Sequence, residues 1–145
     1  FTFAKPKVPN YDFSFSGLKT SILYFLENET RSNPNFIDEN RDDLCASVQK
    51  TIVAILMDQL EKVSSDMGIK EIAIAGGVSA NSSLRARLKE LGLANGWNTY
   101  IPRLEYCTDN AAMIAITGKF MFDAKMFADQ SITAQARMPF THSAT

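Results

Sequence analysis

Hydrophobic residues in this chain recur at helical spacing in four stretches, which turns containing glycine, proline or asparagine separate. The spacing predicts helices over about residues 18–28, 38–66, 79–91 and 109–127, and Gly68 stands where the longest should end. The apolar positions of that helix are Leu44, Val48, Ile52, Ile55, Leu56, Leu60 and Val63. In the third helix we expect leucines 84, 88 and 91 to face the core, and Arg85, Arg87, Lys89 and Glu90 to face solvent.

Two short apolar stretches, residues 69–75 and 97–101, predict β-strands. The helix between them would make them a parallel pair, so the predicted fold class is α/β in the order α-α-β-α-β-α. Two strands make a poor sheet, and the chain starts at Phe1 rather than Met. We therefore expect residues 1–145 to be one partial domain of a longer protein, with a polar tail at 131–145. Its uncovered sheet edges lead us to expect self-association.

The 145 residues are 46% hydrophobic with a net charge of −1, which suits a soluble globular unit. This balance argues against a dedicated nucleic-acid binder, although it does not exclude RNA as a substrate. No apolar run is long enough to span a membrane. Cys45 and Cys107 lack disulfide or zinc spacing, which favours a reduced, cytoplasmic protein. The single histidine, His142, lies in the tail, which argues against hydrolase chemistry.

The first candidate site is the stretch GGVSAN, residues 76–81, between the first predicted strand and the helix that follows it. Gly76 and Gly77 would let backbone N–H groups approach an anion, and Asn81 could bind a ribose, a base edge or a phosphate oxygen. The alternative is that the glycines only form a tight turn and Asn81 caps the helix. The spacing matches neither a Walker loop nor a GxGxxG dinucleotide motif.

A second candidate, CTDN at residues 107–110, follows the other predicted strand. Turns after parallel strands open at the same sheet edge, where Asp109 could hold a metal ion bound to phosphate. Taken alone, Thr108 or Asp109 is better explained as the cap of the last helix. Cys107 is interpreted as a small buried residue, because no histidine or lysine lies near it in the sequence.

The third unusual stretch is DFSFSGLKT, residues 12–20, in which aromatic and hydroxyl side chains alternate. We interpret Phe13 and Phe15 as packing residues that fix the entrance of the first helix, and Lys19 as solvated.

The motifs DFSFSGLKT, AGGVSANSSLR and CTDNAAMIA occur in this order between residues 12 and 115, and together they resemble the TsaD family, also called YgjD or Gcp. The resemblance covers essentially the whole chain and implies the C-terminal part of a longer enzyme. It implies a partial ribonuclease-H-like lobe of the actin/Hsp70/sugar-kinase (ASKHA) fold. The implied activity transfers threonylcarbamoyl from threonylcarbamoyl-adenylate to N6 of the adenosine beside the anticodon, in tRNAs reading codons that begin with A.

By this resemblance Asn81 matches the family's asparagine that contacts substrate and nucleotide, and Gly76 and Gly77 match the glycines that line the phosphates. Asp109 matches the carboxylate ligand of the active-site metal. The implied cofactor is one divalent metal, usually assigned as iron, with zinc or magnesium as alternatives. The family's two metal histidines, in an HxxxH pattern, are not in this chain. Implied partners are tRNA and proteins resembling TsaB and TsaE.

A single aspartate holds a transition metal poorly, so this chain should bind metal weakly or not at all and be inactive alone. A stoichiometric titration at micromolar or tighter affinity would contradict this expectation. Two alternatives stay open: a small-molecule kinase or carbamoyltransferase of the same fold, and a non-catalytic partner subunit like TsaB. The presence of both Asn81 and Asp109 argues against the second.

Overall fold

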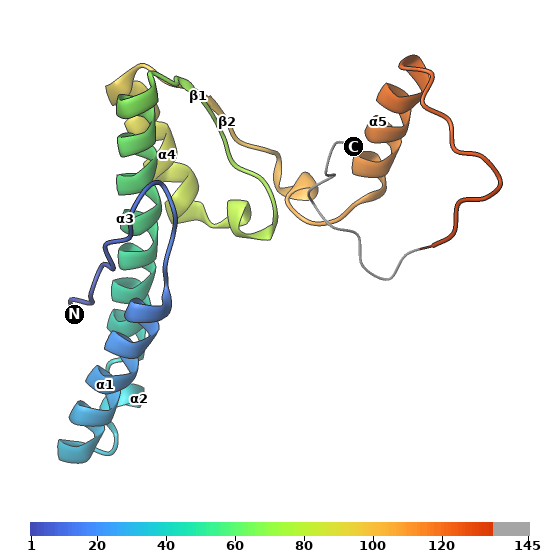
Figure 1. The fold of residues 1–145 in the computed structure, drawn as a ribbon. Coiled ribbons are helices and arrows are strands. Elements are labelled where there is room, and N and C mark those ends of the chain that lie inside the picture. The colour runs from blue at the N-terminus through green and yellow to red at the C-terminus, as the bar shows by residue number, and fades with distance from the viewer. Residues whose placement is uncertain (135–145) are drawn as a thin grey trace. The chain divides into compact units, whose positions relative to one another are not determined.

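The computed structural model, drawn in Figure 1, describes residues 1–134. The chain divides into two compact units between Thr108 and Asp109. His142 and most of the tail predicted at 131–145 lie outside the described residues.

The first unit begins with an irregular segment followed by three helices: α1 (Ser16–Ser32), α2 (Phe36–Glu39) and α3 (Arg41–Met67). The predicted long helix is confirmed as α3, but it starts at Arg41 rather than near Asp38, because the chain breaks at Asn40. Both the backbone N–H and the side-chain Nδ2 of Asn40 donate to the Phe36 carbonyl, at 3.0 and 2.9 Å. These bonds close α2, and α3 starts as a separate helix that ends at Gly68 as predicted.

One hydrophobic cluster joins the N-terminal segment to α1 and α3, which lie side by side in Figure 1. Its buried members are Phe3, Leu18, Leu44 and Ile55. Phe15 packs against this cluster, as predicted for the helix entrance, whereas Phe13 is exposed. Three phenylalanine rings, Phe1, Phe25 and Phe36, have centroids 5.3–5.9 Å apart, a distance that favours tilted and edge-on aromatic contact.

The predicted parallel pair is confirmed, with shorter strands: β1 (Glu71–Ala73) and β2 (Asn98–Tyr100) pair in the register Ile72 to Thr99. A 3-10 turn (Gly77–Ala80) and helix α4 (Ser82–Asn95) connect them, and a second 3-10 turn (Leu104–Tyr106) follows β2. The two turns and α2 are additions to the predicted element order. The core of this part combines α3, α4 and the strands, and consists of Val53, Met57, Ile72, Leu84, Leu88, Leu91 and Trp97.

On the opposite face of the strands, Glu71, Asn98 and Tyr100 are exposed. Glu71 accepts hydrogen bonds from Asn98 Nδ2 and from the Tyr100 hydroxyl, the latter at 2.7 Å. These two donors hold the pKa of the Glu71 carboxyl below its ordinary value, and the same carboxylate raises the pKa of Tyr100. The predicted strand at 69–75 therefore buries only Ile72 fully, rather than being covered on both faces.

At Gly92, helix α4 lies against Thr99 of β2. A Cβ atom at this position would lie 2.6 Å from Thr99 Cγ2, well inside van der Waals contact. We expect Gly92→Ala to destabilise the first unit by about 1–3 kcal/mol, despite the better helix propensity of alanine. Urea unfolding would measure the change. The matched test is the double variant with Thr99→Ala, which removes the clashing methyl and should recover most of the loss; equal losses with and without it would contradict the prediction.

The second unit contains helix α5 (Ala111–Asp123), shorter than the predicted 109–127. Its side chains are all exposed within its own unit, including Ile116 and Phe120. Among the described residues, no helix is both long and apolar enough to cross a membrane.

Candidate functional site

The turn after β1 is built around Gly76 and Ser79. Gly76 has φ 78° and ψ 177°, a backbone conformation that is essentially restricted to glycine. Ser79, which is 1% exposed, donates to the Gly76 carbonyl from its backbone N–H at 3.0 Å and from its hydroxyl at 2.7 Å. Ser79 was not singled out from the sequence; its burial is what identifies it.

Gly77 differs from its neighbour. Its φ is not positive, and a Cβ built on it would meet nothing within 4 Å. The fold therefore requires glycine at 76 but not at 77, so the bare backbone at 77 is left open to solvent or to a ligand.

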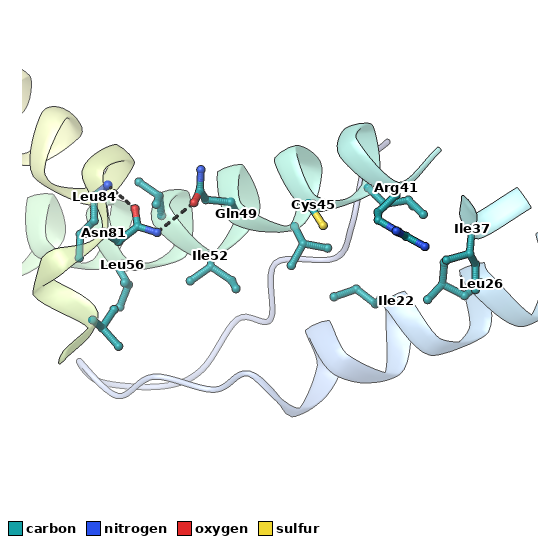
Figure 2. A pocket seen from close by; sticks show the side chains of 14 residues that line it. Ile22, Leu26, Ile37, Arg41, Cys45, Gln49, Ile52, Leu56, Asn81 and Leu84 are labelled. Carbon is teal, nitrogen blue, oxygen red and sulfur yellow. Dashed lines mark hydrogen bonds between the residues drawn. The ribbon is translucent and has the colours of Figure 1, made fainter. Parts of the chain in front are cut away.

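Asn81 caps α4, as one of the two sequence interpretations predicted. Its Oδ1 accepts the Leu84 backbone N–H at 2.9 Å, and its Nδ2 donates to Gln49 Oε1 of α3 at 2.9 Å (Figure 2). An amide side chain carries two N–H donors and two oxygen lone pairs. Capping and the Gln49 contact use one of each, so one donor and one acceptor of Asn81 remain for a ligand.

Asn81 also lies at one end of a largely apolar groove of about 590 Å³ within the first unit. Figure 2 shows side chains of α1 and α3 along it, with Asn81 and Gln49 bonded to each other. Its polar residues are Arg41, Cys45, Gln49 and Asn81.

Arg85, predicted to face solvent, is half-buried, which corrects the sequence interpretation. Its Nη1 donates to the Ser79 carbonyl at 3.0 Å, and its Nη2 donates to the Pro102 carbonyl at 2.7 Å. The helical period places Arg85 at the margin of the buried face of α4, which carries Leu84 and Leu88. At such a position the pattern of apolar residues does not distinguish an arginine in solvent from one that is hydrogen-bonded to the protein.

Cys107 is buried, as predicted, at 2% exposure. Its Sγ donates to the Arg103 carbonyl at 3.5 Å and accepts from Arg85 Nη1 at 3.8 Å. The cationic neighbour that the sequence did not reveal is thus an arginine from α4.

Asp109 is exposed and begins the second unit. The prediction that Thr108 or Asp109 caps the last helix was wrong: the cap of α5 is Asn110, whose Oδ1 accepts the Met113 N–H at 3.2 Å. Within residues 1–134, no three His, Cys, Asp or Glu side chains gather in a way that could hold a metal ion.

The match to known proteins decides the family. Residues 1–116 match TsaD, described as tRNA N6-adenosine threonylcarbamoyltransferase. The chain belongs to the TsaD family. This confirms the resemblance drawn from the three sequence motifs, and with it membership of a transferase family.

Proteins named tRNA N6-adenosine threonylcarbamoyltransferase are similar to this TsaD-family chain over most of its length. The one from Riemerella anatipestifer is 61% identical over 137 residues, which are 94% of the chain and 40% of that protein. The one from Christiangramia forsetii is 51% identical, over 97% of the chain and 41% of that protein. The chain thus spans about 40% of the length of these relatives.

Proposed function

We propose that this chain forms part of an enzyme that transfers threonylcarbamoyl from threonylcarbamoyl-adenylate to N6 of the adenosine beside the anticodon of tRNAs reading ANN codons. The N6 amine attacks the carbamoyl carbon, the bond from that carbon to the phosphate oxygen breaks, and AMP leaves as the amine loses a proton. The proposal includes the cytoplasm as compartment and partner proteins resembling TsaB and TsaE. Family membership is the observation that carries it.

The residues of the GGVSAN turn would serve this reaction by binding and positioning the adenylate. The fold does not require glycine at position 77, yet Gly77 leaves the backbone exposed there. This exposed backbone supports a close approach of phosphate oxygens. Asn81 keeps one amide donor and one lone pair after capping α4, and its side chain is held in place by Leu84 and Gln49. Such preorganised donors lower the activation barrier because they need no reorganisation during the reaction.

We also propose Asp109 as one carboxylate ligand of a divalent metal, with iron preferred and zinc or magnesium as alternatives. The described residues alone do not fit a metal site, since they provide no group of three ligands. No step of the transfer is therefore assigned to a metal.

The kinase-like and TsaB-like alternatives have less support than the transferase. The family match and the relatives' names point to threonylcarbamoyl transfer.

Gly77→Ala tests the proposal because the fold tolerates a Cβ there. In the full-length gene product we expect unchanged folding and about 10-fold lower kcat/KM for transfer from threonylcarbamoyl-adenylate to tRNA, since the methyl displaces the adenylate from the turn. Gly76→Ala is the matched control: it should strain the backbone and lower thermal stability as well. Absence of any transfer by the wild-type protein with its partners would refute the function, and full activity of Gly77→Ala would refute the role of the turn.

A further inference from the structure

One side chain connects the two loops that follow the parallel strands. Arg85, in the first turn of α4, donates to the carbonyls of Ser79 and Pro102. Ser79 belongs to the loop after β1, and Pro102 belongs to the loop after β2. The guanidinium also contacts Cys107 Sγ at 3.8 Å, near the end of the second loop.

The place of these loops makes the connection relevant to a ligand. β1 and β2 are parallel, and their last residues, Ala73 and Tyr100, pair with each other. The loops after both strands therefore leave the same edge of the sheet, which is where ligands bind in open α/β folds. The first loop carries Gly76, Gly77 and Asn81.

Arginine is suited to this connection because its planar guanidinium presents several donors in a fixed fork. Charged donors also make stronger hydrogen bonds than neutral ones. The neighbouring Arg87 gives a contrast on the same helix: it is exposed and only pairs with Glu90, at 3.1 Å. The half-buried position of Arg85 and its two carbonyl acceptors are thus specific to this residue.

We propose that Arg85 is a positioning residue for the transfer reaction. It holds the GGVSAN turn in a fixed position relative to the loop that ends at Cys107. The inference rests on the proposed function. Through the Ser79 carbonyl, Arg85 fixes the segment between Gly77 and Asn81; through Pro102 and Cys107 it fixes the chain two residues before Asp109.

The test compares Arg85→Ala, Arg85→Lys and Arg87→Ala in the full-length gene product. Hydrogen–deuterium exchange is measured on peptides covering 76–81 and 101–108, and transfer kinetics are measured well below the unfolding temperature. We expect Arg85→Ala to speed exchange in both loops, to raise KM for threonylcarbamoyl-adenylate, and to lower kcat/KM about 10- to 100-fold. Arg85→Lys keeps the charge but not the fork, so it should recover part of both effects, and Arg87→Ala should change neither.

The inference would be overturned by unchanged exchange in both loops, by faster exchange with unchanged kcat/KM, or by equal effects of Arg85→Ala and Arg87→Ala. A lower unfolding temperature with full activity per folded molecule would likewise assign Arg85 to stability alone. If Arg85→Ala does not fold, the same criteria apply to Arg85→Lys. An inactive wild-type protein would instead refute the proposed function, while the exchange comparison would still show whether Arg85 connects the loops.

Discussion

Leu88→Ala is expected to destabilise the first unit by about 2–5 kcal/mol, a larger loss of stability than we expect from Gly92→Ala. Leu88 is 0% exposed and lies in the cluster formed by α3, α4 and the strands. Removing its branched side chain leaves a cavity that Met57, Ile72 and Trp97 cannot fill without moving, and domains of this size have only about 5–15 kcal/mol of net stability. The loss should appear in urea unfolding followed by tryptophan fluorescence.

The fluorescence of Trp97 reports on the unfolding of this cluster. Trp97 is the only tryptophan of the 145 residues, and it is buried in the same cluster as Leu88. Leu93→Ala, on the same helix, removes the same atoms from a side chain that is 89% exposed. This control should change stability by no more than about 0.5 kcal/mol. Similar losses from the two substitutions would contradict the packing of α4 against α3 and the strands.

The sequence predicts the main helices and the parallel strand pair because periodic burial determines them. α4 buries Leu84, Leu88 and Leu91 as predicted. In α3 the predicted positions Leu44 and Ile55 are buried and the other five are half-buried, whereas Met57, which was not predicted, is buried. The break between α2 and α3 was missed because it depends on one side chain. Asn40 bonds back to Phe36, and a polar residue at that position is equally compatible with an uninterrupted helix.

The candidate site, too, is predictable from the sequence only in part. Glycines and an asparagine between a strand and a helix indicate the turn. The sequence does not show, however, that the fold requires glycine at position 76, where φ is positive, but not at position 77. Arg85 was misjudged because its acceptors, Ser79 and Pro102, are backbone carbonyls. Every residue has such a carbonyl, so no sequence pattern identifies an arginine that binds them.

Asn81 has the largest expected effect on activity. It combines capping of α4, through Oδ1 and the Leu84 N–H, with the proposed adenylate contact. Asn81→Ala should lower stability by about 1 kcal/mol through loss of the cap. It should also lower kcat/KM for threonylcarbamoyl transfer about 100- to 1000-fold, the usual cost of losing one preorganised donor. Thermal unfolding and transfer kinetics of the full-length gene product would measure the two effects.

Asn81→Ser separates the two roles. Serine is as good a helix cap as asparagine, because its hydroxyl oxygen can accept the Leu84 N–H, so the variant should keep nearly all of the stability. It lacks the amide donors that reach Gln49 and, by our proposal, the adenylate. We therefore expect it to lose nearly as much activity as Asn81→Ala. If Asn81→Ser were stable and fully active, Asn81 would be a helix cap alone, and adenylate recognition would have to be assigned to other residues.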